Sequence, residues 1–195
     1  MKRAAAVLCA AVLCAFGVLC IKNEPPRVVF SLVLAVLLHE AGHICALKLA
    51  GVGVRRVVPL PFGALIDTGD RLCGYLAECG IYMAGPGASF LGAALAVRGA
   101  DAAEMNLQFC FCVLSLGLGS FNLLPLPGLD GAGALRAVLL HCLADMNAAE
   151  RAARAVQAVF TVLFWLASCS LWLIYGIASY PLLLSVFFLL RLFCG

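Results

Sequence analysis

The chain has 195 residues, of which 65% are hydrophobic and only 12% are charged, and its mean hydropathy is +1.09. Ordinary soluble domains are about 45–50% apolar, so this composition excludes such a domain and predicts a polytopic membrane protein. The net charge of +3 and the lack of a basic run exclude a nucleic-acid-binding role. Seven of the eleven cysteines lie within apolar runs and the sequence has no C-x-x-C pair, so we expect small hydrophobes rather than a cysteine zinc site.

The N-terminal part of the chain is predicted to form two helices followed by strands. An uncharged run over residues 4–21 follows Met1-Lys2-Arg3 and predicts an uncleaved first helix. A second apolar run over residues 28–47 predicts a second helix. Between residues 51 and 70, β-branched valines are mixed with prolines and glycines, which favours one or two short membrane-associated strands. An ordinary loop is the alternative for that segment.

The middle of the chain is predicted to add two further membrane helices. The third is expected at residues 74–97, and the fourth lies in the apolar run 105–129. An alanine-rich stretch with scattered charges follows at residues 131–154. Its composition suits a helix on the membrane surface.

The last part of the chain is predicted to hold two spans. Residues 155–190 carry no charge and are too many for one span of about 20 residues, so Gly176 and Pro181 are expected to divide them. Helices 5 and 6 then occupy about residues 155–194. The predicted fold class is an all-α polytopic membrane protein with about six transmembrane helices and a short membrane-associated β segment between helices 2 and 3.

The distribution of lysine and arginine predicts the orientation in the membrane. With the N-terminus in the cytosol, ten of the thirteen basic residues fall on the cytosolic side of a six-span layout. Both termini are therefore expected to be cytosolic. The same layout brings the cytosolic half of the second helix and the cytosolic end of the fourth to a similar depth.

The second helix carries the strongest functional motif, His39-Glu40-Ala41-Gly42-His43, which reads H-E-x-x-H. Residues i and i+4 of a helix share a face, so His39 and His43 can direct two imidazoles at one metal ion. Glu40 lies beside them and suits a general base that activates water. Because an ionisable side chain inside a membrane helix costs about 2.5–3.5 kcal/mol, we interpret the motif as functional. A structural polar cluster between neighbouring helices is the alternative.

Asp130 is the best candidate for a third protein ligand, since catalytic zinc sites usually have three. It follows a segment in which Pro125 and Pro127 end the helix, and broken helices at membrane depth normally line a cavity. The alternative is that Asp130 caps the helix that begins after it. The spacing alone favours neither interpretation.

Both motifs together resemble the site-2 protease family of intramembrane zinc metalloproteases. The resemblance rests on the H-E-x-x-H motif and on Asn122, Pro125 and Asp130-Gly131 in that order, with Pro61-Phe62-Gly63 and Ala84-Gly85-Pro86 as further matches. It covers about residues 28–140, and the short layout is most similar to the branch typified by stage IV sporulation protein FB. We expect one membrane-embedded domain over residues 1–195, without a CBS or PDZ domain.

The resemblance implies a role for each matching residue. His39, His43 and Asp130 would bind one Zn²⁺ per chain, and Glu40 would be the general base. Asn122, Pro125 and Gly63 would contact substrate. The sequence departs from the family pattern at three positions, which leaves the local loop shape open: Gly128, Ser89 and Ala132 stand where the family often has proline, asparagine and glycine.

The predicted function is hydrolysis of a peptide bond in or near the membrane segment of a membrane-associated protein. The resemblance to the sporulation branch implies a transcription-factor precursor as substrate, small membrane proteins as regulators, and a multi-pass location in a bacterial cell membrane or forespore membrane. A metal-ion transporter and an inactive membrane adaptor are the alternatives.

Overall fold

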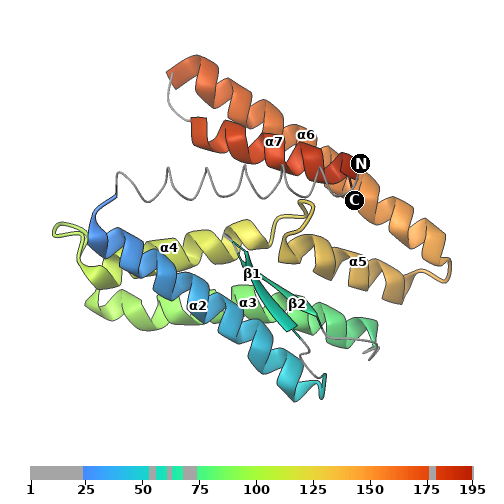
Figure 1. Ribbon diagram of the computed structural model, residues 1–195, viewed down its shortest axis with the longest axis horizontal. Coiled ribbons are helices and arrows are strands. Elements are labelled where there is room, and N and C mark those ends of the chain that lie inside the picture. Colours follow the sequence, from blue (N-terminus) through green and yellow to red (C-terminus); the bar gives the residue numbers. More distant parts are fainter. Residues whose placement is uncertain (1–23, 53–55, 61–62, 68–73, 176–178, 195) are drawn as a thin grey trace.

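Long helices dominate the computed structural model, which describes residues 24–52, 56–60, 63–67, 74–175 and 179–194 (Figure 1). The predicted first helix at residues 4–21 lies outside the described residues. Helices α2, α3 and α4 pack against one another, and α5 continues beside α3. Helices α6 and α7 form a pair on the far side of α4 and α5 (Figure 1).

Helix α2 (Pro26–Leu49) presents one narrow buried stripe to the other helices. Pro26 begins the helix, where its fixed φ angle is favourable and its missing N–H costs nothing. The buried residues recur at every fourth position, so they lie on one face. They are Ser31, Ala35, His39, His43 and Leu47. The two histidines therefore belong to the packed face of α2 and not to its outer face.

Helices α3 (Tyr75–Ala96) and α4 (Leu107–Asn122) bury mainly small residues, which lets the backbones approach closely. A Cβ atom at Gly42 of α2 would lie 2.5 Å from the Ala84 carbonyl oxygen of α3. The short 3₁₀ helix η1 (Val97–Gly99) and a turn connect α3 to α4. Asn106 caps α4, because its side-chain oxygen accepts a hydrogen bond from the Phe109 N–H at 2.9 Å.

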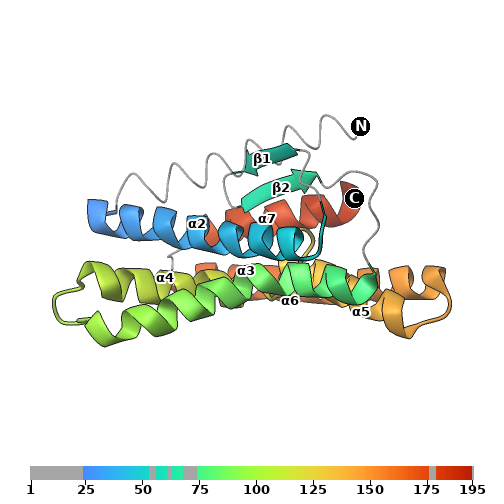
Figure 2. The same ribbon diagram turned by 90° about the horizontal axis from the view of Figure 1, so that it is seen from below.

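Two antiparallel strands, β1 (Arg56–Leu60) and β2 (Gly63–Asp67), form a hairpin between α2 and α3 in the chain. Arg56 pairs with Asp67 at one end, and Leu60 pairs with Gly63 at the other. The hairpin lies on the side of α2 that faces away from α3 (Figure 2). It is shorter than the predicted segment 51–70, and its predicted association with a membrane is not supported.

The predicted fold class is wrong, because the part of the chain that the structure describes does not show six transmembrane helices. Among the described residues, three helices are long and apolar enough to cross a membrane: Pro26–Leu49, Tyr75–Gly99 and Met146–Ile174. Leu107–Asn122 and Pro181–Leu192 are apolar but shorter. Helix α4 ends early because prolines follow at positions 125 and 127, and proline cannot continue the helical hydrogen bonds.

The predicted surface helix at residues 131–154 is also wrong. Helix α5 (Asp130–Cys142) stops at the extended residue Leu143, and α6 (Met146–Tyr175) begins directly after it. Asp145 favours this break, because its carboxylate accepts a hydrogen bond from the Asn147 N–H at 2.8 Å at the start of α6. Helix α7 (Ser179–Cys194) follows, so the long uncharged segment does form two helices.

Candidate metal centre

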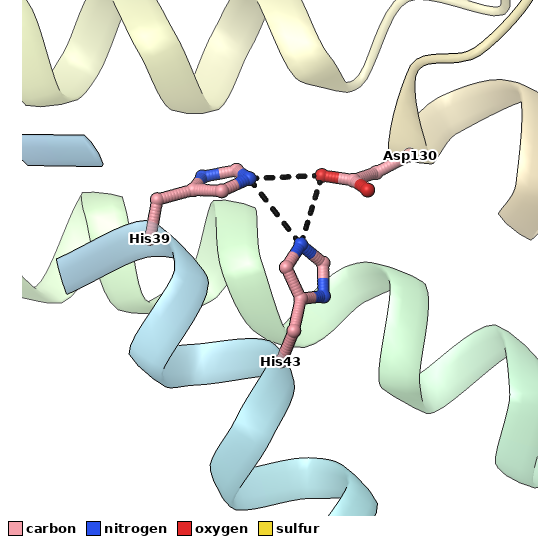
Figure 3. Close-up of side chains that lie close together, drawn as sticks. All are labelled: His39, His43 and Asp130. Atoms are coloured by element: carbon pink, nitrogen blue, oxygen red, sulfur yellow. Dashed lines mark hydrogen bonds and ion pairs between the residues drawn. The ribbon is translucent and has the colours of Figure 1, made fainter. Parts of the chain in front are cut away.

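Helix α2 supplies the first two residues of the candidate site. His39 is 4% exposed and His43 is 8% exposed, and both project from the buried stripe toward the start of α5 (Figure 3). Their ring centroids are 5.0 Å apart, and the ring planes meet at 74°. One turn of helix therefore holds two imidazoles with their Nε2 atoms 3.3 Å apart.

The loop between α4 and α5 delivers Asp130 to the two histidines. Gly128 has φ +93°, a left-handed conformation that favours glycine, and it turns the chain two residues before Asp130. Gly131 allows the start of α5 to approach the Leu123 carbonyl, since a Cβ there would collide with that oxygen. The N-cap residue of α5 is Leu129, and Asp130 is the first residue of the helix itself, so the alternative interpretation of Asp130 as a helix cap is wrong.

Three ligand-type atoms converge at this point (Figure 3). The Asp130 Oδ2 atom lies 3.0 Å from the Nε2 atom of His39 and 3.2 Å from that of His43. One ligand atom from each residue lies within 4.8 Å of the other two, which is the spacing of a group that could hold a metal ion. The structure thus brings together the three residues that the sequence proposed as ligands, and their binding of a metal remains a prediction.

The other ring nitrogens are held by partners outside this group. The Nδ1–H of His43 donates to the Ile81 carbonyl oxygen at 2.8 Å, and Nδ1 of His39 lies 3.0 Å from the buried Ser89 hydroxyl. A carbonyl oxygen can only accept, so neutral His43 carries its proton on Nδ1 and presents a lone pair at Nε2. Such partners are typical of metal-ligating histidines, because they fix the ring orientation and the tautomer.

Gly85 of α3 lies directly against both imidazoles of the group. A Cβ at position 85 would lie 2.8 Å from Nε2 of His39 and 2.6 Å from Cε1 of His43, and closer still to Nε2 of His43. Any side chain there would occupy the space into which the imidazole lone pairs point. The hydrogen of a glycine keeps that space open for a small occupant.

The donor set fits a metal ion such as zinc. Two imidazole nitrogens and one carboxylate oxygen match the ligand types of catalytic zinc, which leaves further positions for water or substrate. Burial opposes ionisation of Asp130, yet hydrogen bonds that His39 and His43 donate when their Nε2 atoms are protonated lower the pKa of its carboxyl below the ordinary value. A lone pair of neutral His43 then faces a carboxylate oxygen, an arrangement that a bound cation would stabilise.

The remaining predicted site residues are not members of this group. Glu40 is half-buried on α2, close enough for its charge to act on His43. Asn122 is buried at the end of α4, and its side-chain N–H donates to the Leu118 carbonyl at 3.0 Å. Pro125 is half-buried in the following loop, and Gly63 begins β2 in the hairpin. Their roles with substrate remain predictions.

Sequence reasoning missed three supporting contacts: the Ile81 carbonyl, the Ser89 hydroxyl and the open space at Gly85. Gly85 belongs to the Ala-Gly-Pro motif, and Ser89 marks a departure from the family pattern. The sequence therefore singled out both positions but did not indicate what either residue does. A backbone carbonyl carries no signal in the sequence. Only the packing of α3 against α2 shows these contacts.

Comparison with known proteins gives sequence relatives and structural neighbours, and no protein-family model matches the chain. Zinc metalloprotease MJ0392 of Methanocaldococcus jannaschii is 32% identical over 115 residues, which cover 55% of this chain and 33% of the relative. A protein of Mycobacterium tuberculosis named zinc metalloprotease Rip3 is 33% identical over 141 residues, or 68% of this chain and 36% of the relative. The chain thus spans about a third of the length of these relatives.

The structural neighbour decides the fold. The site-2 protease from Methanocaldococcus jannaschii matches with a TM-score of 0.67 and 23% identity, over 95% of this chain and 86% of that one. The chain has the site-2 protease fold. The sequence relatives and the site-2 protease fold together support the site-2 protease family, and the apolar helices support a membrane protein. Nothing in these matches selects the sporulation branch.

Proposed function

We propose that this chain is the core of a zinc-dependent intramembrane protease that hydrolyses a peptide bond in or near the membrane segment of its substrate. The observation that carries the proposal is the convergence of His39, His43 and Asp130 within a site-2 protease fold. Relatives named zinc metalloproteases support the choice of zinc and of proteolysis. Two of the three residues, His39 and His43, lie on a helix that is itself long and apolar enough to span a membrane.

Each residue of the group has a distinct task in this proposal. Bound zinc would act as a Lewis acid that polarises a carbonyl group and activates water. His39 and His43 would hold it through Nε2, while their Nδ1 atoms stay with Ser89 and Ile81. Glu40 would accept a proton from water and return it to the leaving amine, as a general acid–base catalyst does.

The substrate must reach this group as an extended chain, since the hydrogen bonds of a helix shield its peptide bonds. The hairpin of β1 and β2 lies against α2, which carries both histidines, and a strand edge can pair with an extended peptide. Gly63 would take part through its place in β2. Asn122 and Pro125 would border the same space from the end of α4.

Finer features of the proposal rest on the sequence resemblance alone. They are the stage IV sporulation protein FB branch, a transcription-factor precursor as substrate, small membrane proteins as regulators, and a bacterial or forespore membrane. The positive-inside distribution of basic residues supports the cytosolic termini.

Oxygen-18 labelling tests the proposed activity on a mixture of proteins, so no single substrate has to be chosen. Purified protein is mixed with detergent-solubilised membrane proteins of the expression host in water enriched in oxygen-18, and new C-termini are identified by mass spectrometry. Hydrolysis places one labelled oxygen in each new C-terminus. We expect labelled termini with the wild type and with Glu104→Gln, a matched change at an exposed residue, and none with Glu40→Gln.

Zinc content separates the ways in which the proposal can fail. We expect about one zinc per chain in the wild type and in Glu40→Gln, and much less in Asp130→Ala. Labelled termini from Glu40→Gln at the wild-type rate would refute the role of Glu40. Zinc in the wild type without hydrolysis of any protein would favour an inactive adaptor, and no zinc in any form would refute the metal centre.

A further inference from the structure

The pair of helices α6 and α7 stands apart from the helices that carry the histidines. Helix α6 packs on α5 and α7, and neither α6 nor α7 makes an extensive contact with α2, α3 or α4 among the described residues. Figure 1 shows the pair beyond α4 and α5, on the side away from α2. Besides the packing of α6 on α5, the pair makes a buried contact with the end of α4 and the loop that leads to Asp130.

Four of the residues that make this contact are called the docking cluster: Phe121, Leu126, Phe164 and Phe188. Leu126 in the loop and Phe188 on α7 are each 1% exposed. Phe121 ends α4 and Phe164 lies on α6, and both pack against this pair. The three rings contact one another with centroids 5.7–6.1 Å apart, distances at which aromatic pairs stabilise each other beyond their buried area.

An apolar cavity of about 340 Å³ opens beside the docking cluster. Residues of α4, α6 and α7 line it: Phe121, Phe164, Ala167, Ser168, Leu171 and Leu184, together with Pro181. The space between α4 and the helix pair is therefore incompletely packed next to the cluster. Atoms that line a cavity lack packing partners on one side. The packed contacts between the loop and the helices α6 and α7 are therefore mainly those of the docking cluster.

The loop has a tight backbone between the docking cluster and Asp130. The Leu126 N–H donates to the Leu124 carbonyl at 2.8 Å, and the Leu129 N–H donates to the Leu126 carbonyl at 3.0 Å. These bonds close a turn that contains Gly128. Because the turn leaves few backbone torsion angles free to rotate, a displacement of Leu126 should also displace Asp130. Leu129 also packs against the cluster, directly before Asp130.

Arg191 of α7 makes a second contact with the same turn. The Arg191 guanidinium lies over Gly128, where a Cβ would be 2.7 Å from its Cζ atom. Its Cζ atom is 6.0 Å from the Phe187 ring centroid, within reach of a cation–π interaction. Helix α7 thus contacts the loop on both sides of the turn, at Leu126 and at Gly128.

We propose that α6 and α7 position the third metal ligand through the docking cluster, an inference that rests on the proposed zinc site. His39 and His43 are held by α2 and α3, whereas Asp130 is the first residue of α5 and directly follows Leu129, which packs against the cluster. Its approach to the imidazoles depends on the packing of α5 on α3 and on the loop before it, which Leu126 and Phe188 attach to α7. The cluster residues are positioning residues, because none of them touches the ligand atoms.

Zinc affinity in a double-mutant cycle tests this proposal. Affinity is measured by chelator competition on detergent-purified wild type, Phe188→Ala, Asp130→Ala and the double variant, with the absorption spectrum of the cobalt-substituted protein as a second readout. We expect Phe188→Ala to weaken zinc binding about 10–100-fold, the range for loss of an outer-shell partner, and to change the cobalt spectrum. Phe188→Leu should restore most of the affinity.

The cycle distinguishes positioning from general loss of structure. If the cluster acts through Asp130, Phe188→Ala has no further effect on zinc affinity once Asp130 is alanine. An additive loss in the double variant would overturn the proposal, as would unchanged affinity in Phe188→Ala. Phe160→Ala, at a 38% exposed ring on α6, is the matched control and should bind zinc as the wild type does. Failure of the wild type to bind zinc would refute the metal centre instead.

Discussion

Replacement of Gly85 by alanine tests the candidate metal centre most sharply, because it adds one methyl group where the ligand atoms meet. A Cβ at this position would lie 2.8 Å from Nε2 of His39 and 2.6 Å from Cε1 of His43. Ordinary contacts begin at about 3.4 Å, so His39 would have to retreat by roughly 0.6 Å and His43, whose Nε2 atom lies closer still, by more than about 0.8 Å. Metal–ligand distances tolerate only about 0.2 Å.

The expected effects on metal affinity and on stability differ in size. Displacing two ligands should weaken zinc binding by more than the ~10–100-fold that loss of an outer-shell partner costs. Overpacking costs about 1–3 kcal/mol of unfolding free energy, and alanine in place of glycine inside a helix returns about 1 kcal/mol. The net loss of stability is then at most about 2 kcal/mol, so Gly85→Ala should fold and fail to hold zinc.

Gly87→Ala provides the matched control on the same helix. Nothing lies within 4 Å of a Cβ at position 87. This variant therefore gains the same helix propensity from alanine without a steric clash. Zinc affinity by chelator competition and thermal unfolding in detergent are measured for Gly85→Ala, Gly87→Ala and the wild type. Equal zinc affinity in all three would refute the placement of the ligand group against Gly85.

Three further predictions concern the support of the site and its coupling to stability. Ser89→Ala removes the partner of His39 Nδ1 and should lower zinc affinity about 10–100-fold, with Ser115→Ala, a buried serine without a hydrogen-bond partner among the described residues, as the unaffected control. Arg136→Gln breaks the ion pair with Glu150 at 2.6 Å; because both side chains are partly exposed, unfolding in detergent should show a loss below about 1 kcal/mol and unchanged zinc content. Zinc at a hundred times its dissociation constant should raise the unfolding free energy by about 2.7 kcal/mol over chelator-treated protein, and no such difference in Asp130→Ala would be expected. An equal zinc effect in Asp130→Ala would exclude that carboxylate as a ligand.

Much of the candidate site could be predicted because it depends on local geometry. Residues four apart on a helix share a face, so the spacing of His39 and His43 already implied a common target. The prolines after α4 implied a break before Asp130, and the composition implied a membrane protein. These inferences need only the helical repeat, the chemistry of proline and the transfer energy of charged groups into a membrane.

The number of spans could not be predicted from apolar runs, because hydropathy does not show where a helix ends. The run at residues 105–129 is long enough for a span, yet α4 stops at Asn122. Residues 131–154 seemed one surface helix, yet Leu143 is extended and Asp145 begins a new helix. Local hydrogen bonds decide these boundaries, and they depend on individual side chains that average properties hide.

The sequence by itself determined the chemistry of this protein: two imidazoles on one helical face, a carboxylate after a broken helix, and an apolar chain around them. Only the tertiary structure decided how these groups are held. Ile81 and Ser89 fix the imidazoles from α3, Gly85 leaves room between them, and the docking cluster carries the Asp130 loop. Such contacts join residues far apart in the chain, and their geometry follows from how closely the helices pack, which no local pattern encodes.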